Sequence, residues 1–262
     1  MPYVRAAGHG LEFERIAATR PGTVPVVLLH QGLGSVSMWR DFPRRIAQTT
    51  GHEVVVYSRY GYGRSEPLAS PRDVRYMHAE ALVALPEVLD ALSIERPILL
   101  GHSDGASIAI IHAGAARRAV SGLVLLAPHV IVEDLAVASI AAARVAYETT
   151  DLRVRLARHH NDVDATFRGW NDIWLDPAFR TWNIEEFLPR IQAPLLVIQG
   201  LDDEYGTLDQ VRRIEQAARD VQRLELTDCG HSPHRDQPAR VLDAVREFVV
   251  RIDGTEAAAL EV

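Results

Sequence analysis

Short runs of apolar residues alternate with amphipathic stretches along most of the chain. Apolar runs are typical of strands that helices cover on both faces, and they occupy residues 24–29, 97–100, 122–126 and 195–199. Residues 53–57 and the short segment 224–226 are predicted as further strands. Helical spacing of apolar positions falls between or after them, at residues 38–49, 76–92, 106–111, 207–218 and 237–252. The alternation predicts an α/β fold, with a mostly parallel sheet of about eight strands and helices on both faces.

Local features add detail to this pattern. Residues 3–17 alternate weakly between apolar and polar side chains, which predicts an antiparallel hairpin at the edge of the sheet. Pro43 is a flaw near the start of the helix at 38–49, and Pro86 is expected to kink the helix at 76–92. We expect the tail from Asp253 onward to be poorly ordered.

One long segment, residues 128–194, breaks the alternation. It shows no good strand and only helix-like pieces, at 133–149, 151–160 and 163–175. Trp170, Trp174 and Trp182 all lie here. A connection of about 65 residues is long for an α/β fold, and such insertions are usually functional. We therefore expect a helical insertion that contributes to a binding site.

Composition limits the classes of protein that fit. The 262 residues are 47% hydrophobic, which is enough for a large core, and the formal net charge is −7. An acidic chain without a basic stripe is not expected to bind nucleic acid. The single cysteine, Cys229, cannot form an internal disulfide. No signal peptide and no membrane-spanning run are visible, so we expect a cytoplasmic protein that does not associate with membranes.

A Gly-x-Ser-x-Gly pattern, Gly101 to Gly105, stands where the apolar run at 97–100 ends and an Ala- and Ile-rich helix begins. The bare pattern is weak, but a serine in a tight strand-to-helix turn is a nucleophile elbow. Small neighbours let the chain pass close beneath the serine. Its hydroxyl then stands at a helix N-terminus, where backbone N–H groups favour an anion. We predict that Ser103 is a nucleophile.

A serine hydroxyl needs a base within hydrogen-bond reach, and a third group must orient that base. His231 is the best candidate for the base, because it follows the last predicted strand in a loop that contains Gly230 and Pro233. His234 is its rival.

The orienting acid is expected on a loop after another strand. Three carboxylates follow the strand at 195–199, and the spacing alone leaves Asp202 and Asp203 both open. Glu133 and Asp134, after the strand at 122–126, are weaker substitutes.

The order Ser103, Asp203, His231 along the chain is the order of α/β-hydrolases. The chain resembles that superfamily over nearly its whole length, through the motifs at residues 30–34, 61–65, 101–105, 200–203 and 230–231. In the family the acid falls three residues after the glycine that Gly200 matches, so the resemblance implies Asp203. It also implies an α/β-hydrolase core at 1–127 and 195–262 and a helical cap at 128–194, whose underside shapes the substrate pocket.

The resemblance further implies an oxyanion hole of two backbone N–H groups aimed at the developing negative charge. One is expected from Asp104, the residue after the nucleophile. The other comes from the loop after His30, where family members commonly read His-Gly-x. This chain departs from that pattern with Gln31, which leaves Gly32 and Leu33 both open.

These residues predict a serine hydrolase that cleaves a carboxylic ester through an acyl-enzyme, with a small to medium substrate that has an apolar or aromatic part. Carbon–carbon bond hydrolysis of ring-fission diketones and lactone opening are alternatives within the same fold. A non-catalytic ligand-binding protein on a hydrolase scaffold is an alternative of another class. Candidate substrate contacts are His129, Trp170, Trp174 and Trp39.

The predicted mechanism needs no cofactor and no metal ion. We interpret His159 and His160 as solvated residues on the surface of the cap rather than as metal ligands. The expected partner is a small-molecule substrate, and the apolar cap is a candidate contact for a homodimer.

Overall fold

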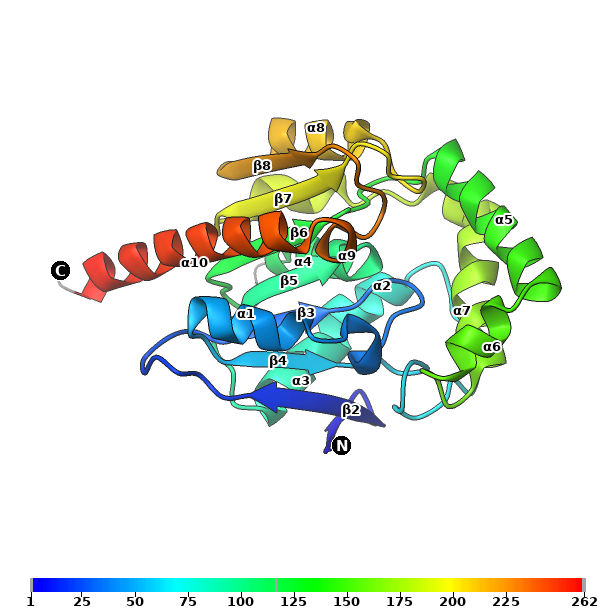
Figure 1. Ribbon diagram of the computed structural model, residues 1–262, viewed down its shortest axis with the longest axis horizontal. Coiled ribbons are helices and arrows are strands. Elements are labelled where there is room, and N and C mark those ends of the chain that lie inside the picture. The colour runs from blue at the N-terminus through cyan, green and yellow to red at the C-terminus, as the bar shows by residue number, and fades with distance from the viewer. Residues whose placement is uncertain (1, 116, 261–262) are drawn as a thin grey trace.

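The computed structural model describes residues 2–115 and 117–260, and within these ranges eight strands form one sheet, in the order β1-β2-β4-β3-β5-β6-β7-β8 (Figure 1). The strands are β1 (Tyr3–Ala6), β2 (His9–Ile16), β3 (Val26–Leu29), β4 (Val54–Tyr57), β5 (Ile98–His102), β6 (Gly122–Leu126), β7 (Leu195–Gly200) and β8 (Val221–Leu226). Strands β3 to β8 are parallel, whereas β1 and β2 pair antiparallel. The predicted fold class and the edge hairpin are confirmed.

Two apolar layers enclose the sheet. Helices α1 (Phe42–Thr50) and α10 (Pro238–Leu260) cover one face and pack against each other. Helices α3 (Leu85–Ala91), α4 (Asp104–Gly114) and α8 (Leu208–Ala217) cover the other face (Figure 1). All residues of β3 to β7 are buried. Burying one such aliphatic side chain contributes about 1.5–3 kcal/mol, which explains why these strands are continuously apolar.

The two prolines lie at different places in their helices. Pro43 lies in the first turn of α1, where a missing N–H costs no helical hydrogen bond, so it is not a flaw. A separate turn of 3-10 helix, η1 (Val36–Trp39), precedes α1. The predicted helix at 76–92 is α2 (Tyr76–Ala79), a π-helical turn η2 (Glu80–Ala84) and α3. Pro86 cannot donate to a carbonyl of the preceding turn, and the π-helical turn is where the hydrogen-bond ladder adjusts.

The end of the chain is more regular than expected. The helix predicted to end at residue 252 continues, as α10, to Leu260. Residues 256–260 are Glu-Ala-Ala-Ala-Leu, all strong helix formers. Gly254 does not end the helix, because it does not take a left-handed conformation.

Most of the segment from 128 to 194, called the cap segment below, lies beyond the ends to which the parallel strands point (Figure 1). Its helices are α5 (Asp134–Thr149), α6 (Leu152–Ala157), α7 (Val163–Leu175), η3 (Pro177–Thr181) and η4 (Glu185–Arg190). Asp162 caps α7 by accepting a hydrogen bond from the backbone N–H of Ala165 at 2.9 Å. Element η4 returns to pack against α4 and α8 of the core.

In the part of the chain that the structure describes, no helix has both the length and the apolar character needed to cross a membrane.

Candidate active site

Ser103 lies at the turn between β5 and α4. Its backbone angles, φ 54° and ψ −118°, fall in a strained region for a residue with a side chain. The turn is held because the Ser103 N–H donates to the Leu126 carbonyl at 2.9 Å. A Cβ on Gly105 would overlap the carbonyl oxygen of Leu29, and one on Gly101 would overlap the carbonyl of Gly105. Only glycine fits at both positions, so the motif is explained by close backbone packing around the serine.

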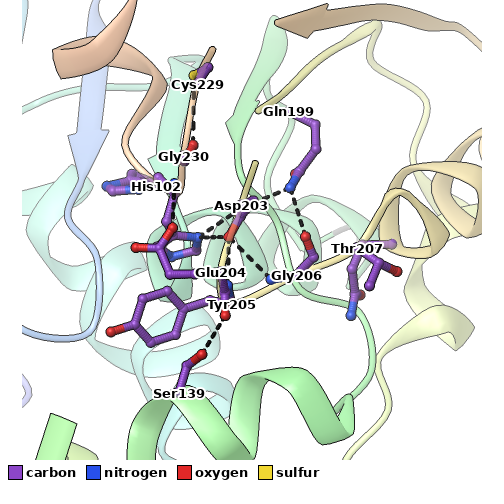
Figure 2. Close-up of polar contacts among 12 residues, drawn as sticks. His102, Ser139, Gln199, Asp203, Glu204, Tyr205, Gly206, Thr207, Cys229 and Gly230 are labelled. Carbon is purple, nitrogen blue, oxygen red and sulfur yellow. Dashed lines mark hydrogen bonds and ion pairs between the residues drawn. The ribbon is translucent and has the colours of Figure 1, made fainter. Parts of the chain in front are cut away.

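Asp203 and His231 face each other from the loops after β7 and β8. The Nδ1 atom of His231 lies 2.9 Å from both carboxylate oxygens of Asp203. Three further donors converge on the same carboxylate, as Figure 2 shows. The backbone N–H groups of Tyr205 and Gly206 donate to Oδ1 at 2.8 and 3.1 Å, and Gln199 Nε2 donates to Oδ2 at 2.7 Å.

These contacts decide the charge of the acid. Burial raises the pKa of Asp203, but the hydrogen bond and charge of His231 and the N–H of Tyr205 outweigh it, so the pKa lies below its ordinary value. The carboxylate is therefore ionised at neutral pH, and it favours the His231 tautomer with its proton on Nδ1.

Two more contacts fix the backbone around His231. His102 Nε2 donates to the His231 carbonyl at 2.6 Å, and Glu204 accepts from the His231 N–H at 3.2 Å. Burial and the charges of His234 and His231 hold the pKa of His102 well below its usual range, so its ring is neutral. No pattern in the sequence distinguishes His102, Glu204 or Gln199, because each acts through a contact between distant segments.

The rival residues lie elsewhere. His234 is buried, and its ring packs against the rings of Trp39 and Phe42. Asp202 is exposed and interacts through its backbone N–H, which donates to the Cys229 carbonyl. The remaining two rival acids bind partners other than His231. Glu133 accepts hydrogen bonds from Thr207 and Gln210. Asp134 forms an ion pair with Arg180 on the surface.

The loop after His30 presents the predicted oxyanion groups. Within the described residues, no protein acceptor takes the backbone N–H of Gly32, Leu33 or Asp104. His30 shapes the start of this loop, because its Nδ1 donates to the Gln31 carbonyl at 2.7 Å and its Nε2 accepts from the Arg59 N–H at 3.1 Å. Burial and the Arg59 charge hold the pKa of His30 well below its usual value, which keeps Nε2 an acceptor.

A pocket of about 150 Å³ joins these groups. Its lining combines the elbow, the oxyanion loop, the acid and histidine loops and the cap segment: Gln31, Gly32, Leu33, His102, Ser103, Asp104, His129, Ala136, Ile140, Trp170, Trp174, Glu204, Tyr205, His231 and Ser232. Burial lowers the pKa of His129 to about 3, with a smaller contribution from His231, so His129 is a neutral polar group in this pocket. A Cβ on Gly32 would overlap the Trp170 indole, so this cap side chain lies directly on the oxyanion loop.

Two residues lie where the sequence did not predict them. Trp39 does not line the pocket, contrary to expectation, because η1 packs it against Phe42 in the layer formed with α1 and α10. His160 is buried rather than solvated, in contact with the core loops. Among the residues the structure describes, no group of three or more His, Cys, Asp or Glu side chains is arranged to hold a metal ion.

Known proteins resemble this chain in sequence and in fold. It is 24% identical over 233 residues to the 2-hydroxy-6-oxo-6-phenylhexa-2,4-dienoate hydrolase of Comamonas testosteroni, covering 79% of this chain and 80% of that one. It is 28% identical to a protein of Pseudomonas savastanoi pv. phaseolicola provisionally named carbamate hydrolase RutD, covering 90% and 98%.

A solved thermophilic esterase from Thermogutta terrifontis superposes with a TM-score of 0.75 at 20% identity, covering 96% of this chain and 99% of that one. That likeness concerns the fold alone. The family model described as "Alpha/beta hydrolase family" matches residues 26–244, from β3 into α10. The chain is therefore a hydrolase that belongs to the alpha/beta hydrolase family.

Proposed function

We propose that this hydrolase cleaves a small, uncharged carboxylic ester through a covalent intermediate on Ser103. One observation carries the proposal, namely that three kinds of group meet at one pocket. They are a serine on a strained elbow, a histidine whose Nδ1 faces Asp203 at 2.9 Å, and backbone N–H groups that find no acceptor among the described residues.

Each group has a step to perform in this scheme. The Ser103 Oγ attacks the ester carbonyl carbon while His231 Nε2 takes the hydroxyl proton, and His231 then returns that proton to the leaving alcohol. Asp203 holds the Nδ1–H, which leaves the Nε2 lone pair free and stabilises the imidazolium. The Asp104 N–H, together with that of Gly32 or Leu33, binds the carbonyl oxygen as it gains negative charge. Water then attacks the acyl-enzyme by the same route, and the acid is released.

The pocket supports a small acyl group. Its volume is about 150 Å³, and an apolar cavity of roughly 150 Å³ is large enough to hold benzene. Ile140, Trp170 and Trp174 supply apolar walls, and neutral His129 supplies a polar group. We therefore expect acyl groups from acetyl to about the size of benzoyl.

The charge of the pocket supports an ester over the diketone alternative. The dienoate in the name of the Comamonas relative is a carboxylate. None of the described residues that line this pocket is Lys or Arg, and the carboxylate of Glu204 lies among them. A buried anionic substrate would lack a counter-charge there. A short lactone is an internal ester and would follow the same steps as an open ester.

The test is hydrolysis of p-nitrophenyl esters from acetate to decanoate, by the wild type and by Ser103→Ala. We expect the highest kcat/KM among the short acyl chains and a fall of about 10⁴ or more in the Ser103→Ala variant. Hydrolysis that survives the substitution would refute the assignment of Ser103. A wild-type protein that a fluorophosphonate probe fails to label would instead favour a non-catalytic binding protein.

A further inference from the structure

Two side chains connect the cap segment to the residues that would supply the oxyanion N–H groups. One connection runs from Trp174 through Tyr76 to Asp104, and the other runs from His160 to Leu33. Both Tyr76 and His160 are buried, and neither lines the pocket. The two connections therefore reach the two sides of the expected oxyanion hole without touching a substrate.

Tyr76, the first residue of α2, lies between the cap segment and the elbow. Its hydroxyl donates to Asp104 Oδ2 at 2.6 Å and accepts the indole N–H of Trp174 at 3.1 Å. The other carboxylate oxygen of Asp104 has no hydrogen-bond partner within the described residues, and Arg59 approaches Oδ2 only to 3.8 Å. Tyr76 is thus the close hydrogen-bond partner of the Asp104 side chain.

His160 makes the second connection. Its Nδ1 accepts the N–H of Gly63 at 2.9 Å, so its Nε2 carries the proton and donates to the Leu33 carbonyl at 3.1 Å. Burial lowers the pKa of this ring to about 4, despite its hydrogen bond to Leu33, so the ring is neutral near pH 7. Two glycines flank Leu33, and a turn rich in glycine is flexible unless something holds it. The hydrogen bond from the His160 imidazole, which belongs to the cap segment, fixes this turn in place.

We propose that Tyr76 and His160 are positioning residues, through which the cap segment sets the placement of the Asp104 and Leu33 ends of the oxyanion hole. This inference rests on the proposed function, because it assigns these N–H groups to a developing oxyanion. It goes further, because it makes the packing of the cap segment against the core a condition for a high kcat as well as for substrate binding.

The expected effect is on the transition state. Oxyanion donors act on charge that develops during the reaction, so misplacing one lowers kcat and leaves KM nearly unchanged. Outright loss of a donor costs about 10²–10³ in kcat. We expect Tyr76→Phe and His160→Leu, which displace a donor without removing it, to lower kcat by about tenfold to a hundredfold.

The chain offers matched controls for both variants. Tyr57 is also fully buried, but its hydroxyl has no hydrogen-bond partner among the described residues, so Tyr57→Phe makes the same chemical change without breaking a connection. His159 precedes His160 and contacts Ser37 instead of the oxyanion loop, so His159→Leu is the second control. His160→Gln retains an N–H donor and should restore part of the lost rate.

The experiment measures kcat and KM for p-nitrophenyl acetate, the rate of fluorophosphonate labelling, and inhibition by a short alkylboronic acid, whose serine adduct is tetrahedral and anionic. Circular dichroism checks that each variant folds. The inference is supported if Tyr76→Phe and His160→Leu lower kcat and the labelling rate at unchanged KM, and if boronate inhibition weakens in proportion to the fall in kcat. The control variants should remain close to the wild type.

The inference is overturned if folded Tyr76→Phe and His160→Leu are labelled at the wild-type rate, if only KM changes, or if the controls lose as much activity. If one variant does not fold, the other decides the question. A wild-type protein that is never labelled marks failure of the proposed function instead, so the two failures are distinguishable.

Discussion

Replacing Asp203 by Asn tests the histidine tautomer on which the proposed mechanism depends. The amide has one oxygen, and two fixed backbone donors, the N–H groups of Tyr205 and Gly206, point at the Oδ1 position. The amide oxygen therefore takes that position, and the NH₂ group takes the place of Oδ2, facing His231 Nδ1. The Oδ1 and Oδ2 positions both lie 2.9 Å from His231 Nδ1, so the ring then faces an amide oxygen and an amide N–H donor. Accepting that N–H at Nδ1 favours the tautomer with its proton on Nε2, which cannot take a proton from Ser103.

The magnitude follows from this change of tautomer. An Asp→Asn substitution that forces the wrong tautomer in a serine protease triad lowers kcat by about 10⁴, which corresponds to about 5 kcal/mol in the activation free energy. The fold should survive, because Gln199 has an Oε1 atom without a partner among the described residues and can turn its amide to accept from the new NH₂, although this breaks the hydrogen bond from Gln199 Nε2 to the Gly206 carbonyl. We expect a loss of stability of about 2 kcal/mol from the weakened hydrogen bonds.

The assay pairs Asp203→Asn with Asp202→Asn, which makes the same change of charge one residue earlier at an exposed side chain. Esterase kcat and the rate of fluorophosphonate labelling are measured for both, and urea unfolding reports stability. The control should remain within about twofold of the wild type, as surface substitutions usually do. An Asp203→Asn protein that is folded and within tenfold of the wild-type rate would show that the tautomer argument is wrong.

Three further predictions test packing, pH dependence and pocket size. Gly105→Ala should lower the free energy of unfolding in urea by about 3 kcal/mol or more, because the new Cβ meets a backbone carbonyl. The control Gly10→Ala places its Cβ in open space and should change that free energy by less than about 1 kcal/mol. Three buried histidines have lowered pKa values of about 3, 4 and 3, namely His129, His160 and His234. The unfolded chain binds protons at these histidines below about pH 6.5, whereas the folded chain does not until about pH 4. The free energy of unfolding should therefore fall as the pH is lowered through that window, by roughly 1 kcal/mol per pH unit for each histidine. Urea unfolding at pH 7.0 and 5.5 checks this, and equal stabilities would contradict it. Trp170→Ala should move the preferred p-nitrophenyl ester toward longer acyl chains by about tenfold in relative kcat/KM, and an unchanged profile would mean that Trp170 does not bound the acyl site.

The sequence predicted the parts of this protein that depend on local order along the chain. Apolar runs followed by amphipathic stretches marked the parallel strands and their helices, because strands buried on both faces must be apolar throughout. Gly101 and Gly105 marked the elbow, since a side chain at either position would overlap backbone. The spacing of loops after strands brought Asp203 and His231 to one edge of the sheet, although Asp202 and Asp203 were distinguished only by resemblance.

Tertiary structure decided what depends on contacts between distant segments. Trp39 was predicted to contact substrate, but η1 places it in the apolar layer that α1 and α10 form on one face of the sheet. His160 looked like a surface residue, but it is buried against Gly63 and Leu33, about a hundred or more positions earlier in the chain. No sequence pattern marked Tyr76, because its role depends on hydrogen bonds from its hydroxyl to Asp104 and from Trp174 to that hydroxyl, which form only in the folded chain. Local patterns determine which segments form strands, helices and turns, whereas the partners of a buried polar group are set only when those segments pack together.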